Sequence, residues 1–251
     1  MQLTNDMMEI LILLLADDVV LLSETVIGLQ TQLNCLFRAA TRLQLKVNLS
    51  KSNIIVFRKG GYLSVRERWS YNGLTMPVVN IYKYLGIYFS TKLSFTAACK
   101  DIASRGKRAL VYIVRKLSAL DNQSLELFLK IFDSQVQPIL QYGSEIWGLY
   151  DAASQCENVH LFALKKFLGV SNKTPNDLVY GEVNRFPIYL NSAVQCIKYW
   201  LKLTQMETSR LPKKAYNMLY ILDTRGKVNW VTMVKRKLYR SGFVVFGSSR
   251  G

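Results

Sequence analysis

Residues 9–24 read EILILLLADDVVLLSE and place two adjacent aspartates, Asp17 and Asp18, inside an apolar run. The flanking leucine, isoleucine and valine residues form two short apolar runs typical of strands, and the ADD between them favours a turn. Residues 9–22 therefore predict a β-hairpin with both carboxylates at or near its tip. Because unpartnered carboxylates are costly to bury and repel one another, this placement needs a physical reason.

One reason would be a divalent cation that neutralises the two carboxylates. Mg²⁺ prefers one or two protein carboxylates and completes its shell with water and substrate phosphates. A pair of such ions can hold the attacking and leaving oxygens during phosphoryl transfer. The alternative is an exposed Asp-Asp turn that binds no metal, and on the dipeptide alone this is the commoner outcome.

The composition indicates a globular protein with a polyanionic partner. The chain has 251 residues, of which 50% are hydrophobic and 20% are charged, enough for one or two domains. Its 33 Lys and Arg against 17 Asp and Glu give a net charge of +16, which points to nucleic acid more often than to an anionic membrane. Residues 151–251 carry 16 basic and 6 acidic groups, whereas residues 1–60 carry 6 and 5. The excess of positive charge therefore lies in the C-terminal part of the chain.

Metal and membrane motifs are weak in this sequence. Four separated cysteines without a CxxC pair, and a single histidine, make a zinc site of ordinary spacing unexpected and favour free thiols in a reducing, intracellular compartment. The apolar stretch from Ile10 to Ala16 is shorter than the roughly 20 residues that a membrane span needs. No membrane partner is expected, although a membrane-associated protein with an apolar N-terminus is kept as a third alternative.

The hydrophobic pattern predicts an α+β fold. After the hairpin, apolar residues at helical spacing predict an amphipathic helix that begins near the N-cap Ser23 and covers a sheet. Residues 45–57 predict a strand, a polar break and a second apolar run. Residues 58–73 form a glycine-containing connection, and residues 77–90 predict another strand pair. From residue 96 onward the periodicity is helical, over 96–117, 122–147 with a kink at Pro138, 154–168 capped by Gly169, 191–205 and the basic tail 227–240.

The helix predicted over 96–117 has a one-sided basic face. Four cations fall within an arc of about 100° at 3.6 residues per turn, opposite an apolar side that includes Ile102 and Leu110. Such a face can contact the phosphates of a nucleic acid, and its plain alternative is a solvated helix surface. The four cations are Arg105, Arg108, Arg115 and Lys116.

Several segments resemble, in order and spacing, the reverse transcriptase of non-LTR (LINE-type) retrotransposons. Ala16-Asp17-Asp18 matches the family's Ala-Asp-Asp turn, and Tyr84, Leu85 and Gly86 match its primer-gripping hairpin. The later TPNDLVYGE and CIKYWLKL are similar to the helical region that follows the polymerase. The family's strand-and-lysine motif is matched by Leu45, Lys46, Val47, Asn48 and Lys51.

The resemblance implies roles for these residues. Asp17 would bind the catalytic Mg²⁺ ions with Asp18 supporting the site, and Lys51 would lie near the incoming phosphates as a proton donor or charge stabiliser. Tyr84 to Gly86 would position the primer end, and the helix over 96–117 would be the thumb. A solvated turn lysine is the alternative for Lys51. A core aromatic with a turn glycine is the alternative for Tyr84 to Gly86.

The resemblance also divides the chain into a partial palm (1–60), a connection with a primer-grip-like hairpin (61–95), thumb-like helices (96–150) and a basic helical C-terminal region (151–251). In the family a further metal-binding aspartate and the fingers precede the hairpin, and an aromatic residue stands where this chain has Leu15. The sequence thus predicts a truncated reverse transcriptase (RNA-directed DNA polymerase) that is catalytically incomplete on its own.

The alternative is a non-enzymatic nucleic-acid-binding protein derived from such an enzyme. In both cases RNA and DNA, contacted along the template–primer backbone, are the expected partners. A second chain could supply the rest of the palm, although nothing in the sequence indicates one. A nuclear location follows from the resemblance.

Overall fold

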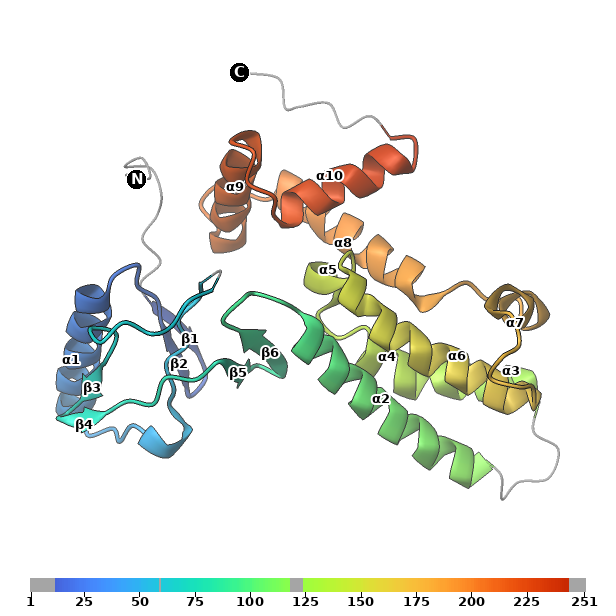
Figure 1. Cartoon of the computed structure of the whole chain (residues 1–251), viewed down its shortest axis with the longest axis horizontal. Coiled ribbons are helices and arrows are strands. Elements are labelled where there is room, and N and C mark those ends of the chain that lie inside the picture. The colour runs from blue at the N-terminus through green and yellow to red at the C-terminus, as the bar shows by residue number, and fades with distance from the viewer. Residues whose placement is uncertain (1–11, 59, 118–123, 244–251) are drawn as a thin grey trace. The chain divides into compact units, whose positions relative to one another are not determined.

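The computed structural model describes residues 12–58, 60–117 and 124–243 (Figure 1). Contacts within the chain separate it into two compact units, Met1–Ser94 and Phe95–Gly251. The described strands all lie in the first unit, as three two-stranded sheets, and most of the helices lie in the second. The mixed α and β character expected from the sequence is confirmed, while the division into four segments remains a prediction.

The hairpin predicted over residues 9–22 is present with shorter strands. Strand β1 (Ile12–Leu15) pairs antiparallel with β2 (Asp18–Leu21), and Leu15 stands opposite Asp18. Helix α1 (Val26–Arg42) follows. The predicted N-cap Ser23 is wrong, because the hydroxyl of Thr25 accepts a hydrogen bond of 3.0 Å from the Gly28 N–H. Ser23 instead donates its hydroxyl to the Thr25 carbonyl.

The strand predicted in residues 45–57 is wrong. This segment contains only a 3₁₀ turn, η1 (Leu49–Lys51), and an isolated parallel bridge between Ile54 and Val78. Local polar side chains compete with strand pairing, because Ser52 donates to the Asn48 carbonyl at 2.8 Å and Ser50 donates to the Asn48 side chain at 2.7 Å.

Two further hairpins complete the first unit. Strands β3 (Ser70–Tyr71) and β4 (Leu74–Thr75), which the sequence analysis missed, join through Asn72-Gly73 with φ values of 49° and 77°. Strands β5 (Ile81–Tyr84) and β6 (Ile87–Ser90) confirm the pair predicted within 77–90. The core of this unit is small and consists of Leu33, Ile54, Trp69, Tyr71 and Met76.

In the second unit, α2 (Thr96–Leu117) packs along α6 (Ser154–Leu168), as Figure 1 shows. The predicted bounds of α2 are confirmed, and so is the C-cap Gly169, which has a φ of 66°. A short 3₁₀ turn, η3 (Asp151–Ala153), precedes α6.

The single helix predicted over 122–147 is broken into pieces. These are α3 (Leu125–Ile131), the π-helical turn η2 (Phe132–Val136), α4 (Gln137–Leu140) and α5 (Ser144–Trp147). In the π turn the Gln137 N–H donates to the Phe132 carbonyl, five residues back. Pro138 has no N–H and its ring clashes with a preceding carbonyl in a regular helix, so the wider turn accommodates it. Residues 122–123 lie outside the described residues.

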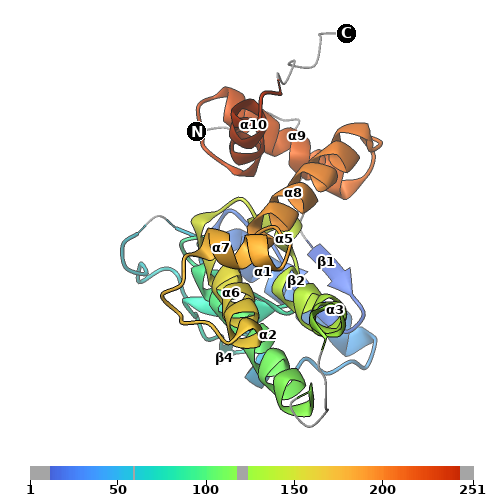
Figure 2. The same cartoon turned by 90° about the vertical axis from the view of Figure 1, so that its right-hand side faces the viewer.

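The last described helices form a subcluster. Helix α7 (Asn176–Glu182) leads to α8 (Ile188–Gln205), which begins before the predicted residue 191, and then to α9 (Leu211–Thr224) and α10 (Trp230–Arg240). Helices α7 and α9 were not predicted. Figures 1 and 2 show α8 leading away from α7 toward α9 and α10. These last three helices share a core of Leu203, Tyr216, Trp230, Val231, Val234 and Leu238.

The four cysteines are free thiols, of which Cys35 is exposed and the other three are buried. Burial raises the thiol pKa of Cys99, Cys156 and Cys196 to about 12. Within residues 12–58, 60–117 and 124–243, none of the helices combines the length and the apolar character that crossing a membrane requires.

Candidate functional site

The tip of the β1–β2 hairpin presents the two aspartates to solvent. Asp17 lies in the turn, Asp18 is the first residue of β2, and both are exposed. Ala16 has a φ of 52°, a left-handed conformation that is uncommon for a residue other than glycine. Because water solvates both carboxylates, the apolar neighbours impose no burial penalty, and the turn by itself does not demand a metal.

The base of the hairpin, by contrast, is fastened to α1. The Gln32 side-chain amide donates to the Leu22 carbonyl at 2.8 Å, and Leu21 packs against the core of the first unit. The strands nevertheless expose much apolar surface, with Leu14 at 68% and Leu15 at 53%. The carboxylates are therefore held on a short, anchored support whose apolar sides are largely open.

Lys51 lies at the end of the η1 turn and not on a strand. Its side chain is exposed, and its carbonyl accepts a 2.8 Å hydrogen bond from the Tyr82 hydroxyl on β5. This bond brings the lysine turn next to the predicted primer-grip hairpin. Among the described residues, no hydrogen bond or ion pair joins the side chain of Lys51 to Asp17 or Asp18.

The predicted primer-grip residues form the tight turn between β5 and β6. Tyr84 ends β5 and is half-buried, while Leu85 and Gly86 both adopt positive φ, at 47° and 80°. Leu85 is 43% exposed. The turn thus has an exposed tip next to a half-buried tyrosine ring.

The predicted basic face of α2 is smaller than expected. Arg105 is half-buried, forms an ion pair with Asp101 at 2.9 Å and lies over the ring of Tyr142. Arg108, Arg115 and Lys116 are exposed. Arg108 donates to the Ser104 hydroxyl at 2.9 Å, and the Lys116 ammonium lies 5.7 Å from the centre of the Tyr112 ring.

The hairpin carboxylates fit one hard cation by their chemistry. Two adjacent, solvent-accessible carboxylates are the protein donors that Mg²⁺ accepts alongside water and phosphate. Within the described part of the chain, no group of three or more His, Cys, Asp and Glu side chains is arranged to hold a metal ion. The residues at the tip therefore fit a weakly held Mg²⁺ and not an enclosed protein site.

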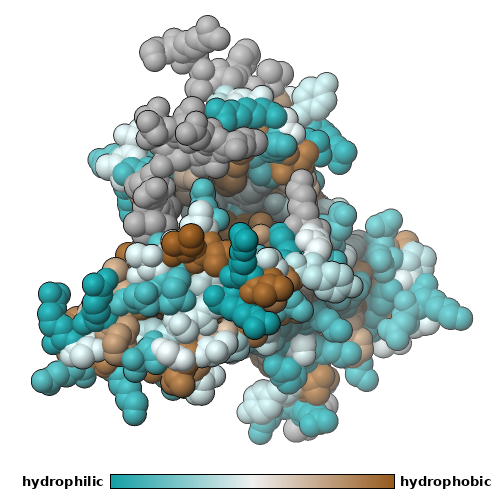
Figure 3. Space-filling view, turned by 60° about the vertical axis from the view of Figure 1, so that its left-hand side comes forward, coloured by the Kyte–Doolittle hydropathy of each residue, from teal (hydrophilic) through white to brown (hydrophobic). Residues whose placement is uncertain are grey.

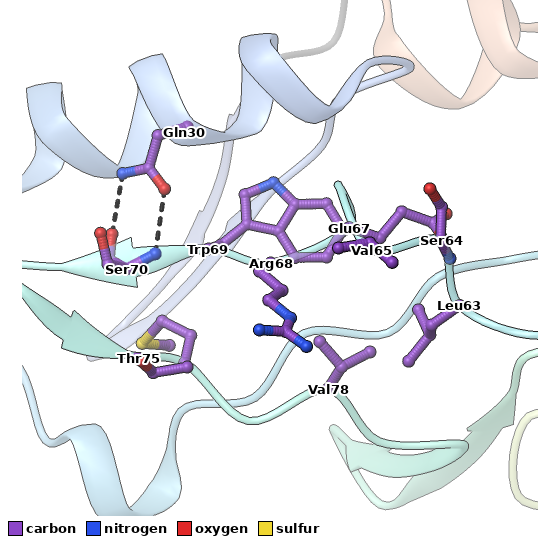
Figure 4. A pocket seen from close by; sticks show the side chains of 11 residues that line it. Gln30, Leu63, Ser64, Val65, Glu67, Arg68, Trp69, Ser70, Thr75 and Val78 are labelled. Carbon is purple, nitrogen blue, oxygen red and sulfur yellow. Dashed lines mark hydrogen bonds between the residues drawn. The ribbon is translucent and has the colours of Figure 1, made fainter.

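A pocket of about 620 Å³ in the first unit is separate from these residues (Figure 4). Gln30 on α1 braces one side by bonding both the N–H and the carbonyl of Ser70, at 2.9 and 2.8 Å. Figure 4 shows the Arg68 side chain between Trp69 and Val78. None of Asp17, Asp18, Lys51 and the predicted primer-grip residues lines this pocket.

A buried polar network in the second unit escaped the sequence analysis. The Glu157 carboxylate accepts hydrogen bonds from the Tyr180 hydroxyl and, at 2.9 Å, from the Tyr189 N–H, and it lies 3.1 Å from Nδ1 of His160. Burial alone would raise the pKa of Glu157, but these bonds lower it overall. Burial, together with the hydrogen bond to Glu157, raises the pKa of Tyr180. The three-residue spacing of Glu157 and His160 on one helix was the available signal.

A transposon polymerase is similar to part of this chain. Over 114 residues the chain is 30% identical to the "Probable RNA-directed DNA polymerase from transposon X-element" of Drosophila melanogaster. A region of this chain is therefore related to a reverse transcriptase. The match covers 44% of this chain but 12% of that relative, so it spans a small part of the longer protein. No family model and no solved structure matches the chain.

Proposed function

We propose that this chain comprises the end of the palm, the thumb and the downstream helical region of a retrotransposon reverse transcriptase, and that it binds a template–primer duplex. The observation that supports this most directly is the exposed Asp17-Asp18 pair at the tip of an antiparallel hairpin, in a chain related to a transposon polymerase. A polymerase active site of this kind would need carboxylates that can reach a metal ion, and an Ala-Asp-Asp turn between two apolar strands provides two of them.

In this proposal each element has a separate task. Asp17 and Asp18 hold Mg²⁺, which when bound would neutralise charge on the oxygens of phosphoryl transfer. Lys51 places a cation or proton near the incoming phosphates from its exposed turn. The Tyr82–Lys51 hydrogen bond sets that turn beside β5, whose continuation at Tyr84 positions the primer end.

Helix α2 supplies the sequence-independent contact. Arg108, Arg115 and Lys116 are exposed along a helix whose other side is buried at Ile102 and Leu110. Cations spaced along one face neutralise successive phosphates and release counterions, which makes binding salt-dependent. This arrangement supports the role of a thumb that follows a duplex.

We further propose that the chain shows little polymerase activity by itself. Two-ion phosphoryl transfer needs more oxygen ligands than two carboxylates supply, and among the described residues no group of three or more His, Cys, Asp and Glu could hold a metal ion. A second candidate function, a nucleic-acid-binding protein without chemistry, is favoured by the net charge of +16. A nuclear location is proposed from the resemblance alone.

Primer extension on an RNA template with Mg²⁺ tests the chemistry. We expect no extension from the wild type or from Asp17→Ala, in preparations that still bind a labelled RNA–DNA duplex. The matched control is Glu24→Ala, which removes another exposed carboxylate from the same unit. Extension that Asp17→Ala abolishes and Glu24→Ala preserves would show an assembled site and overturn the proposal of an incomplete enzyme.

Salt-dependent binding tests the thumb. Replacing two exposed cations of α2 (Arg108→Gln with Lys116→Gln) should weaken duplex binding and flatten the plot of log affinity against log salt by about 1.8. The control is Arg66→Gln with Arg68→Gln, which removes equal charge from exposed positions of the first unit. Equal effects of the two double variants would mean that α2 is an ordinary solvated face.

A further inference from the structure

The segment that holds the last two described helices carries a large excess of positive charge. Residues 210–240 carry nine basic side chains and one acidic one, Asp223. That acid is already engaged, because Lys235 donates to its carboxylate at 2.7 Å and Thr232 donates to it as well. Burial alone would raise the pKa of Asp223, but these bonds and the nearby cations lower it overall. Arg236 also lies near Asp223, so nine cations share a single acid within this segment.

Three exposed side chains form a stripe along α10, which we call the α10 stripe. They are Arg236, Tyr239 and Arg240, at positions i, i+3 and i+4, which share one face of a helix. The opposite face is buried, at residues that include Val231 and Val234. The stripe therefore faces away from the core that α10 shares with α8 and α9.

A purely structural role does not explain why the side chains of the α10 stripe are exposed to solvent. Tyr239 is 79% exposed, and both arginines are exposed. Over residues 12–58, 60–117 and 124–243, no side chain forms a hydrogen bond or ion pair with any of the three. A cation near a helix C-terminus complements the helix dipole, which accounts for Arg240 but not for a tyrosine held in water.

A membrane surface is disfavoured as the partner. Amphipathic helices that bind membranes insert their apolar face among the lipids. In α10 that face is already used, because Trp230, Val231, Val234 and Leu238 are packed inside the protein. The face of α10 that points to solvent is therefore cationic and carries one amphipathic ring, that of Tyr239.

We infer that the α10 stripe is a second nucleic-acid contact, distinct from α2, and that its ligand is single-stranded. The guanidinium groups of Arg236 and Arg240 match phosphate oxygens in bidentate fashion, and the Tyr239 ring offers a face on which an unpaired base stacks. In a duplex the bases are already stacked on each other and leave no free face. The inference deepens the proposed function, on whose nucleic-acid partner it rests, by naming a single strand.

Fluorescence anisotropy with the full chain tests this inference. The probes are labelled oligouridylate and oligothymidylate of equal length, and a labelled RNA–DNA duplex. Tyr239→Ala should weaken binding of the single strands about tenfold with an unchanged salt slope, since stacking carries no charge. Tyr239→Trp should retain binding. Arg236→Gln with Arg240→Gln should weaken it and make the slope shallower by about 1.4.

Matched controls separate the stripe from general effects. Tyr62→Ala removes a tyrosine that is 99% exposed in the first unit, and Arg66→Gln with Arg68→Gln removes equal charge. A loss shared by both single strands supports stacking and phosphate contact as the recognition chemistry. A loss greater for oligouridylate supports the same contact with a preference for RNA through its 2′-hydroxyl.

Three results would overturn the inference. If Tyr239→Ala behaves like Tyr62→Ala while the α2 double variant still loses duplex binding, the α10 stripe is not a contact and the proposed function stands. Binding of neither single strand nor duplex by the wild type would refute both proposals. Sedimentation with phosphatidylserine vesicles that depends on Arg236 and Arg240, without any effect on oligonucleotides, would assign the stripe to membranes.

Discussion

The two units of the chain differ in how completely they bury their cores. In the first unit the five core side chains remain 5–8% exposed. The second unit contains side chains that are 0% exposed, among them Ile102, Val136, Leu140 and Leu164. Two-stranded sheets are marginal without a partner surface, and the first unit contains three of them. The aspartate hairpin therefore lies in the unit whose core is less completely buried, and the core of the helical unit is more completely buried.

Exposed apolar side chains sharpen the contrast. Ile12, Leu14, Leu15 and Val19 of the aspartate hairpin are each more than 40% exposed. Figure 3 shows hydrophobic residues reaching the surface in several places on one face of the molecule. Short strands with open apolar sides contribute little burial, so we expect the first unit to unfold more easily than the second.

The largest expected effect comes from a matched pair of tryptophans. Trp147 is 1% exposed and Trp69 is 5% exposed, and each donates its indole N–H to a backbone carbonyl at 2.9 Å. Trp147→Ala should destabilise the second unit by about 4 kcal/mol, and Trp69→Ala the first by about 3 kcal/mol. Urea unfolding followed by circular dichroism should show two transitions, each moved by one variant.

Conservative variants test the same comparison. Trp69→Phe and Trp147→Phe keep most of the volume, so each should move its own transition less than the alanine variant does. A single transition that both alanine variants shift equally would break the comparison, because the chain would then unfold as one cooperative body.

The next effect concerns acid stability of the second unit. Because the folded-state pKa of Glu157 is lowered, its ionised form stabilises the fold above the ordinary value of 4.5, and this contribution is lost as the pH falls through the lowered pKa. Asp223 acts in the same direction. The helical transition should therefore weaken below about pH 4.5.

The variant Glu157→Gln isolates this network. It should cost about 2 kcal/mol at neutral pH, because buried donors on Tyr180 and His160 lose a carboxylate partner, and it should reduce the acid dependence. Urea midpoints measured across acid pH provide the comparison, with Glu182→Gln as the exposed control on α7. An unchanged pH profile in Glu157→Gln would assign acid unfolding to other groups.

The smallest effect comes from a pair of helix caps. Thr25 caps α1 through the Gly28 N–H, and Ser124 caps α3 through the Leu127 N–H, at 3.0 and 3.1 Å. Either alanine variant should cost about 1 kcal/mol, which is a larger fraction of the unfolding free energy of the first unit than of the second. Hydrogen exchange at the Gly28 and Leu127 amides measures this cost, and Thr25→Ser should restore protection. If both units lost the same fraction of their unfolding free energy, the difference between them would be contradicted.

The elements that the sequence predicts well are those whose pattern is local. The apolar spacing of 96–117 predicts α2 to the residue, and alternating short runs around Ala16-Asp17-Asp18 predict the hairpin. The prediction of a strand in residues 45–57 is wrong because Ser50 and Ser52 form local hydrogen bonds with Asn48. The pattern of apolar residues does not reveal such bonds.

The candidate site is only partly predictable for a related reason. Exposure of Asp17 and Asp18 follows from a tight hairpin, but the link between Lys51 and Tyr82 joins residues 31 positions apart and depends on the fold. The ion pair of Arg105 with Asp101 was readable from its spacing of four residues, and it removes one cation from the basic face. The α10 stripe had the same kind of local signal, but its exposure required the packed structure.

The π turn at Phe132–Val136 constrains how many residues its segment contains more strictly than it constrains which residues they are. Phe128, Phe132, Val136 and Leu140 are spaced four residues apart and are all buried. In a regular α-helix such a row would drift by about 120°, and the wider turn offsets the drift. Deleting one residue there would rotate everything downstream by about 100°. We therefore expect this segment to accept exchanged residues over generations but to reject insertions and deletions.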